Sequence, residues 1–218
     1  MTTLSAREAY ARWASTYETE TAISFLENLV VAGLAGPTID GCVLDVGCGT
    51  GRRLQSIHAF GVDVSIEMLR RAHSSAIVAA SDARALPFRD AAFDVVWCRL
   101  MIGHLRAIAP VYSELARVVR VGGTVIVTDL APDAARAGHQ RTFRDSDGVV
   151  REVEHFVHDT DAQIAAARAA RLDVVAHRTG VVGPEIRHFY ADARRLTTYE
   201  AQIGLPLVVA FSFVKTSA

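Results

Sequence analysis

One stretch, VLDVGCGTG from Val43 to Gly51, constrains the fold of this chain more than any other. It begins with an apolar run that contains a single acid, Asp45, which is the pattern of a buried parallel strand. Gly47, Gly49 and Gly51 follow at alternate positions. Glycines there allow a tight turn and let a ligand approach the backbone without meeting a Cβ atom. The stretch therefore predicts a strand followed by a turn whose amide groups face a ligand.

Two nucleotide-binding motifs compete for this stretch. The dehydrogenase fingerprint GxGxxG needs a third glycine for helix–strand packing, and counting from Gly47 that position is Arg52. The observed spacing, D-x-G-x-G-x-G, resembles motif I of the class I S-adenosylmethionine-dependent methyltransferases. A tight turn without any ligand is the structural alternative. The resemblance implies that the cofactor is surrounded by Asp45, Gly47, Cys48, Gly49 and Gly51.

An acid also ends the next predicted strand, over 59–63. Ser65 is a good N-cap for the helix that follows. An acid at the tip of this strand can accept hydrogen bonds from both ribose hydroxyls, as acids do in dinucleotide sites. The resemblance gives Asp63 this role, with Val64 beside it, whereas a solvated loop aspartate is the alternative. The helix between the two strands is expected to be very short, over 51–56.

A third strand over 76–80 precedes the segment D-x-x-x-L-P-F, which begins at Asp82. This segment resembles the loop after the third strand in the same family, where the aspartate contacts the adenine amino group. A carboxylate suits that role because it accepts from an NH₂ donor. The neighbouring amide of Ala83 is expected to serve a ring nitrogen.

A fourth strand over 93–98 runs into Arg99 and, five residues later, His104. Ligands bind beyond the carboxyl ends of strands in open α/β sheets, so Arg99 is expected at the cofactor and His104 near the acceptor. His104 is the candidate general base, and a histidine satisfied by backbone groups is the equal alternative. A helix begins with Pro110 as its first residue and is expected to close at Gly122.

The N-terminal segment predicts a helical cover. Ser5 and Glu8 have capping-box spacing. Tyr10, Trp13 and Tyr17 then recur on one helical face, and this segment resembles the aromatic segment that covers the cofactor in small-molecule methyltransferases. The resemblance places Tyr10 and Tyr17 at the cofactor, while a plain packing stripe is the alternative. A second helix is expected over 21–34, ended by Gly36-Pro37.

The remainder of the chain completes the alternation of strands and helices. A strand over 124–130 is followed by a polar, Arg-rich and irregular segment. Within it, His139, Arg141 and Arg144 face either an anionic acceptor or, as the plainer interpretation, solvent. Further elements are expected as a helix opened by a capping box at Thr160 and ending near Arg171, a strand over 173–176, a helix over 190–202 and a last strand over 205–214.

Strand–helix alternation predicts a doubly wound α/β sheet. The resemblance implies a Rossmann-like sheet of seven strands, mostly parallel with an antiparallel last strand. The 218 residues suit one domain with a sizeable core. We expect a single methyltransferase domain over 1–218, with a helical lid over 1–38 and a substrate-side insertion over 131–158.

Composition restricts the partners and the location. The formal net charge of −1 predicts no general attraction to nucleic acid. No apolar run is long enough to span a membrane, and the first residues do not resemble a signal peptide, so a cytoplasmic protein is expected. The three cysteines, Cys42, Cys48 and Cys98, fit no zinc or redox spacing.

The resemblance implies methyl transfer from S-adenosylmethionine to a small-molecule acceptor, most simply at oxygen, with nitrogen or carbon open. A base is needed only where the acceptor must lose a proton. His104 is the first candidate and His155 a weaker one. His155 and His158 lack an evident third ligand, so no metal is expected. A nicotinamide-dependent oxidoreductase and a non-catalytic member of the fold are the alternatives.

Overall fold

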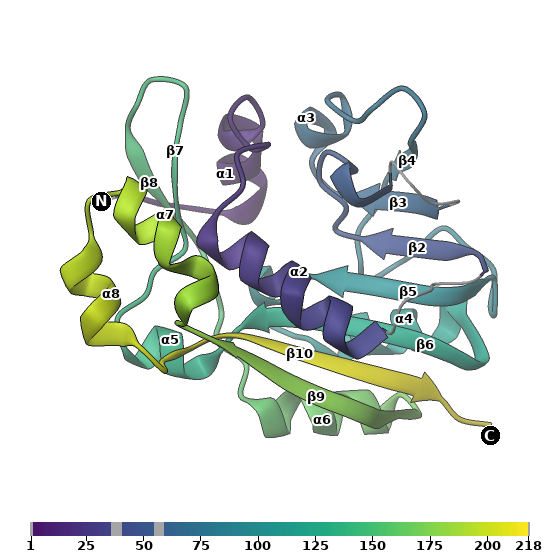
Figure 1. The fold of residues 1–218 in the computed structure, drawn as a ribbon. Helices are drawn as coiled ribbons and strands as arrows, with labels where there is room; N and C mark the ends of the chain where they lie inside the picture. Colours follow the sequence, from purple (N-terminus) through teal and green to yellow (C-terminus); the bar gives the residue numbers. More distant parts are fainter. Residues whose placement is uncertain (1, 36–40, 55–58, 218) are drawn as a thin grey trace.

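A seven-stranded sheet organises the chain in the computed structural model, which describes residues 2–35, 41–54 and 59–217 (Figure 1). The strand order is β4-β3-β2-β5-β6-β10-β9, in which β10 runs antiparallel to β6 and β9 and the other pairs are parallel. This confirms the predicted Rossmann-like sheet. The strands of this sheet are β2 (Val43–Val46), β3 (Ala59–Asp63), β4 (Ile77–Ala80), β5 (Phe93–Arg99), β6 (Val119–Leu130), β9 (Leu172–Val181) and β10 (Pro206–Lys215). The helices are α1 (Ala6–Trp13), α2 (Ala22–Ala35), α3 (Ile66–Leu69), α4 (Ala109–Val118), α5 (Pro132–Arg136), α6 (Thr160–Ala169), α7 (Arg187–Asp192) and α8 (Leu196–Gln202).

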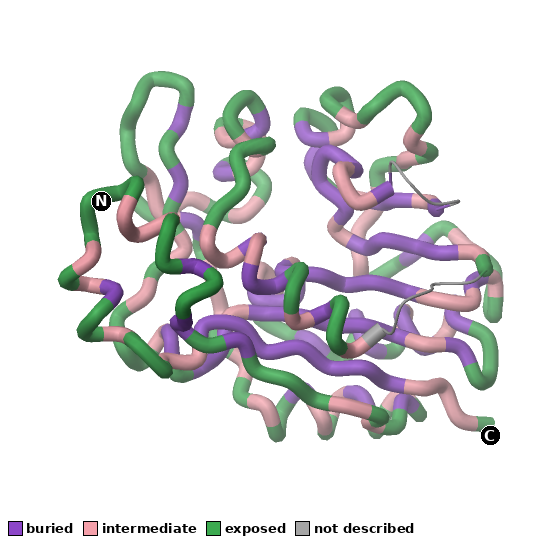
Figure 2. The backbone as a smooth tube through the Cα atoms, in the orientation of Figure 1, coloured by how far each residue is buried: buried purple, intermediate pink, exposed green. Residues whose placement is uncertain are grey.

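Helices cover both faces of the sheet, and this buries its central strands (Figure 2). The alternation along β10 separates the two faces. Phe211 and Phe213 pack with Tyr112 of α4, whereas Val208 packs with Leu26 of α2. All four residues of β2 are buried. The strand that carries the glycine turn is therefore held from every side.

Several predicted boundaries differ from the structure. α4 ends at Val118, not at Gly122, and Gly122, with a φ of +74°, lies inside β6. The β-branched pair Val118-Val119 favours the change to an extended chain at this point. The helix predicted over 190–202 is two helices, because Arg194 has a φ of +55°, which a right-handed helix cannot contain.

The predicted capping box at Thr160 is wrong, although the helix it announced exists. α6 begins at Thr160 with Asp159 as its N-cap, and the Asp159 side chain makes no capping hydrogen bond. β9 extends from Leu172 to Val181, well beyond the predicted strand over 173–176. Pairing with the long strand β10 explains this length, since tertiary contacts override local propensity.

The segment predicted to be irregular contains α5 and a second small sheet. β7 (Thr142–Arg144) and β8 (Val150–Val153) form an antiparallel hairpin, and β1 (Thr3–Leu4) pairs in parallel with β8. The turn between β7 and β8 has a local signal, because Asp145 accepts amides of its own turn and Gly148 has a φ of +77°. This sheet joins the first residues of the chain to the insertion.

The N-terminal capping box is confirmed, since Ser5 and Glu8 exchange both bonds. α1 ends at Trp13, so Tyr17 lies in the following turn and not on the predicted helical face. The predicted stop at Gly36-Pro37 and the end of the helix over 51–56 lie outside the described residues; Arg52–Leu54 form a 3₁₀ turn.

Among the described residues, no helix is both long and apolar enough to cross a membrane.

Candidate functional site

The turn after β2 is built on glycine for steric reasons. Gly47 and Gly49 have φ angles of +79° and +59°, in the left-handed region that side chains rarely adopt. A Cβ atom on Gly47 would also clash with Cγ of Met101. The amides of Gly47 and Cys48 donate to the carbonyl oxygen of Val62 at 2.8 and 3.0 Å, which ties the turn to the end of β3. The turn is therefore a fixed wall that another group can approach closely.

Asp63 lies at the carboxyl end of β3, next to this turn. Its Oδ2 accepts the amide of Gly49 at 2.8 Å and its Oδ1 accepts the amide of Ser65 at 2.8 Å. Burial raises the pKa of Asp63, against the lowering effect of these amide bonds. Each carboxylate oxygen retains a further lone pair. The group is thus held in place with acceptor capacity to spare.

A cavity of about 220 Å³ opens beside Asp63, at the carboxyl ends of β2, β3, β4 and β5. Residues of α1 line another part of its wall. This is the edge of an open α/β sheet at which ligands bind. The structure brings together on this wall the predicted residues Tyr10, Tyr17, Gly47, Gly49, Asp63, Val64, Asp82, Ala83, Arg99 and His104.

Three residues predicted at the cofactor are not on this wall. Asp45 is fully buried in β2, burial raises its pKa, and neither carboxyl oxygen has a partner among the described residues. Cys48 turns its sulfur toward Gly61, where an added Cβ would lie 2.7 Å from Sγ. Gly51 faces Ala76. These residues lie behind the turn and shape it.

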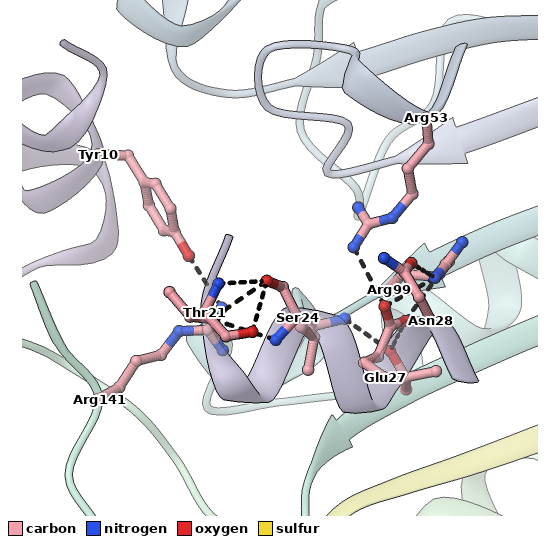
Figure 3. A network of polar contacts seen from close by, with 10 residues as sticks. Tyr10, Thr21, Ser24, Glu27, Asn28, Arg53, Arg99 and Arg141 are labelled. Atoms are coloured by element: carbon pink, nitrogen blue, oxygen red, sulfur yellow. Dashed lines mark hydrogen bonds and ion pairs between the residues drawn. The ribbon is translucent and has the colours of Figure 1, made fainter. Parts of the chain in front are cut away.

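Arg99 lines the cavity, but its guanidinium group is engaged elsewhere (Figure 3). Its Nε and Nη2 donate to the two carboxylate oxygens of Glu27 in α2, each at 2.7 Å, and Nη2 also donates to Asn28. Arg53 and Thr128 donate to the same carboxylate. Burial would raise the pKa of Glu27, but these bonds and the arginine charges hold it below its ordinary value. This buried cluster fastens α2 to the sheet under the cavity.

Asp82 and Ala83 follow β4 at the cavity wall. Arg84 donates from Nη2 to Oδ2 of Asp82 at 2.6 Å and from Nε to Oδ1 at 2.9 Å, and these bonds lower the pKa of Asp82. The two side chains are 55% and 37% exposed. Exposed pairs of this kind contribute little to stability. Arg84 can therefore release Asp82 to a ligand at small cost.

Aromatic side chains close the cavity from the N-terminal side. Tyr10 stacks on Trp13 with ring centroids 5.5 Å apart, and Trp13 stacks on Phe143 of β7 at 5.0 Å. Tyr17 packs edge-on against both Tyr10 and Trp13. The cover over the cavity is thus built from α1 and the β7–β8 hairpin together.

His104 meets this cover at Tyr10. Its Nδ1 lies 3.2 Å from the carbonyl oxygen of Glu154, which can only accept, so Nδ1 carries the proton. Nε2 therefore accepts the hydroxyl of Tyr10, 2.9 Å away. Burial lowers the pKa of His104 well below its usual range, and burial raises the pKa of Tyr10 to about 12. Both side chains are neutral near neutral pH, and the lone pair of His104 is occupied.

His155 lies beside His104 but is not on the cavity wall. The two ring centroids are 6.0 Å apart, and Nε2 of His155 donates to Oδ1 of Asp129 at 3.1 Å. His158 instead contacts the carbonyl oxygen of Leu105 at 2.8 Å. Within the described ranges, no three histidine, cysteine or acidic side chains are grouped so as to hold a metal ion.

Sequence reasoning missed two parts of the site. Glu27 has a visible signal, as the one acid in the apolar helix AISFLENLVVAGLA. Met68 also lines the cavity, and nothing local distinguishes it from a core residue; Met101, which lies in the segment after the fourth strand that was predicted to border the site, lines the cavity as well. Arg141, which the sequence left between acceptor and solvent, lies beside Tyr10 with its Nη2 donating to the hydroxyl at 3.0 Å.

Comparison with protein families matches residues 44–127 to a methyltransferase domain. A demethylmenaquinone methyltransferase of Roseiflexus castenholzii is 34% identical over 139 residues, which are 56% of this chain and 58% of that protein. A malonyl-[acyl-carrier protein] O-methyltransferase of Pseudescherichia vulneris is 31% identical over 140 residues, 61% of this chain and 56% of that protein. The chain therefore spans little more than half the length of these relatives.

Solved structures share the fold over most of the chain. An S-adenosylmethionine-dependent methyltransferase of Thermotoga maritima superposes with a TM-score of 0.69 at 17% identity, covering 96% of this chain and 99% of that one. A geranyl diphosphate C-methyltransferase of Streptomyces coelicolor, in complex with Mg²⁺, geranyl diphosphate and S-adenosyl-L-homocysteine, has a TM-score of 0.63 at 16% identity, covering 87% and 76%. At these low sequence identities, the similarity shows a shared fold only.

Proposed function

We propose that this chain carries a class I, S-adenosylmethionine-dependent methyltransferase domain and that it transfers a methyl group to a small-molecule acceptor, most simply at oxygen. The observation that carries this proposal is the carboxylate of Asp63. It is fixed by two backbone amides at the carboxyl end of β3, beside a glycine turn and on the wall of a cavity. This arrangement suits a ribose with two adjacent hydroxyls.

The donors and acceptors on the wall fit the cofactor. Asp63 accepts from the ribose hydroxyls, and Asp82 and the amide of Ala83 take the adenine edge once Arg84 has moved aside. Gly47 allows close approach at the turn, because a Cβ atom would fill that space. Val64, Gly49, Tyr10, Tyr17 and Arg99 complete the wall, and Asp45, Cys48 and Gly51 support it from behind.

When bound, S-adenosylmethionine supplies an activated methyl group on a sulfonium sulfur. The residues of this chain hold the acceptor in line and exclude water. Correct placement alone can supply about 7–11 kcal/mol of the barrier in such reactions. The aromatic cover of Tyr10, Trp13 and Tyr17 serves both purposes, because it closes the cavity from α1.

His104 reaches the cavity through Tyr10. An acceptor hydroxyl that donates to the oxygen of Tyr10 can lose its proton there, while the tyrosine proton passes to Nε2 of His104. His104 is thus the base candidate only in company with Tyr10. His155 contributes at most by holding Asp129 in place, since its Nε2 proton is committed to that carboxylate.

Several features support a small-molecule acceptor. The aromatic cover lies over one side of the cavity, and one of the relatives is named for a demethylmenaquinone. We assign the whole chain to one domain, with residues 131–158 as the insertion on the acceptor side and residues 1–38 as an N-terminal helical segment in which α1 is the lid and α2 is fastened to the sheet. The pairing of β1 with β8 supports this, because it connects lid and insertion directly.

Calorimetric titration with S-adenosylhomocysteine, with NADH as the control ligand, tests the proposal. We expect the wild-type chain to bind S-adenosylhomocysteine alone. Asp63→Asn removes the charge from the ribose acceptor and should weaken binding about tenfold to a hundredfold. Asp133→Asn, on the exposed surface of α5, should bind like the wild type. Binding of NADH alone, or equal affinity in Asp63→Asn at an unchanged melting temperature, would sink the assignment.

A further inference from the structure

Arg141 is a half-buried cation that has no carboxylate partner among the described residues. Among the described residues, no acidic group forms an ion pair with its guanidinium, although ten other ion pairs are present in the same set. Nη2 donates to the hydroxyl of Tyr10 at 3.0 Å, and the buried Nη1 has no hydrogen-bond partner within the described part of the chain. A buried charge that is neither paired nor fully hydrogen-bonded is costly to keep. Its presence therefore calls for a partner from outside the chain.

The hydrogen bonds around Arg141 run in one direction. Arg141 donates to Tyr10, Tyr10 donates to His104, and His104 donates to the carbonyl oxygen of Glu154. None of these side chains accepts a hydrogen bond from Nη1. Arg141 itself is not on the cavity wall; its free donor lies behind Tyr10, which together with His104 lines that end of the cavity.

Nearby groups do not neutralise the cation. Asp129 is the acid whose charge acts on Arg141, but it is not within ion-pair distance. One oxygen of Asp129 accepts from His155 and from the amide of Leu130. Tyr10 and Tyr17 also face Arg141, and burial keeps Tyr10 protonated. The charge of Arg141 is consequently not cancelled by an ion pair within the described residues.

The lowered pKa of His104 also reflects the nearby charge of Arg141. Burial lowers its pKa first, and the Arg141 cation lowers it further. An imidazole in that setting is a weak proton acceptor. An acceptor molecule that arrives already ionised needs no base there and supplies the missing negative charge.

We propose that Nη1 of Arg141 binds an anionic oxygen of the methyl acceptor, so that the acceptor is a small molecule with an acidic hydroxyl or a carboxyl group, bound as its anion. This inference rests on the proposed function, since it names the acceptor class for the same cavity. A guanidinium suits the task because it remains charged when buried and offers a planar pair of donors to an oxyanion. The structural alternative is an ordered water on Nη1.

Three related nitroarenes separate these outcomes: 4-nitrophenolate, 4-nitrobenzoate and neutral nitrobenzene. Their binding is measured by calorimetry, with and without S-adenosylhomocysteine, at a pH at which both acids are ionised. We expect at least one anion to bind the wild type more tightly than nitrobenzene. Tighter binding of the phenolate or of the carboxylate identifies which acid the acceptor carries.

Variants of two arginines in the same segment provide the contrast. Arg141→Gln should lose about tenfold to a hundredfold in affinity for the preferred anion and nothing for nitrobenzene. Arg141→Lys keeps the charge and should lose less. Arg144→Gln is the matched control, because Arg144 is an exposed residue of β7 that donates to the carbonyl oxygen of Gly148, and it should bind as the wild type does.

The melting temperature provides a second measurement. If Arg141 only stabilised the fold, replacing it would lower the melting temperature. Without ligand, Arg141→Met should melt no lower than the wild type, since it removes an unpaired, half-buried cation. Equal anion affinity in wild type and Arg141→Gln, no preference for an anion in the wild type, or a marked fall in the melting temperature of Arg141→Met would each overturn the inference. S-adenosylhomocysteine binding to the same samples is independent of these results, so a failure of the proposed function is recognised separately.

Discussion

At the scale of single residues, the predictable parts of the site are those set by neighbours in the sequence. Asp63 is the last residue of β3 and Asp82 comes two residues after β4, and the carboxyl ends of parallel strands meet at one edge of the sheet. Both lie on the cavity wall. Arg141 contacts Tyr10 across 131 positions of the chain, and no local pattern distinguishes it from the exposed Arg144. Contacts of this kind become visible only once the insertion is folded.

Gly103 illustrates how closely the acceptor side is packed. A Cβ atom there would clash with Nε2 of His155 and lie 2.7 Å from Oδ1 of Asp129. We expect Gly103→Ala to separate this pair and to lower the free energy of unfolding by about 1–3 kcal/mol, as overpacking does. Urea denaturation measures the change. Gly33→Ala, inside α2 where only the flexible Arg178 side chain is near, should be neutral or stabilising; equal losses in both variants would contradict the packing argument.

At the scale of elements, the existence of strands and helices was predictable, and their ends were less so. The capping box of α1 and the apolar strands depend on adjacent residues. The length of β9 depends instead on its pairing with β10, and the break between α7 and α8 depends on one left-handed residue, Arg194. The sequence of the β7–β8 hairpin contains a turn signal at Asp145 and Gly148, but the polar, Arg-rich composition of the segment led to the prediction of an irregular structure.

The attachment of α2 to the sheet depends on Glu27. Glu27→Ala leaves Arg99 buried without its carboxylate, which should lower the free energy of unfolding by about 3–5 kcal/mol. Urea denaturation at neutral pH measures this loss. Glu20→Ala provides the control, because Glu20 is exposed and its side chain forms no hydrogen bond or ion pair among the described residues. A loss below that of an ordinary surface substitution would show that the ion pairs of Glu27 do not hold α2.

The same carboxylate predicts a pH dependence. The pKa of Glu27 is lower in the folded chain than its ordinary value, so the unfolded chain binds the proton more readily. The stabilisation is complete above the ordinary glutamate pKa, about 4.3, and is lost as pH falls through the folded value. We expect the difference between wild type and Glu27→Ala to shrink in acid. A difference that stays constant with pH would contradict the ionised pair.

The cover over the cavity joins two elements that are distant in sequence. Phe143 of β7 stacks on Trp13 of α1, and β1 pairs with β8. Phe143→Ala should therefore loosen both parts, so that backbone amides of α1 and β8 exchange hydrogen faster. Hydrogen exchange read by mass spectrometry tests this, with Val149→Ala in the exposed hairpin turn as the control. Faster exchange confined to the hairpin would show that α1 remains folded without the contact to Phe143.

At the scale of the whole molecule, one motif and a regular alternation of elements were enough to predict the sheet. The glycine turn after β2 implies a buried strand before it and places the turn at the edge of the sheet where ligands bind. The connections between successive strands and helices then lead to the observed strand order. The acceptor side was not predictable to the same extent, because it is assembled from α1, the hairpin and the end of β6. The cofactor region is thus local in sequence, and the acceptor region is not.

The most direct test of the account is a crystal structure of the chain with S-adenosylhomocysteine bound. We expect the ribose hydroxyls at the carboxylate of Asp63 and the adenine at Asp82 and Ala83, with Arg84 displaced from Asp82. Density for the ligand elsewhere on the chain, or a ribose that does not contact Asp63, would contradict the central claim that this cavity is the cofactor site of a methyltransferase.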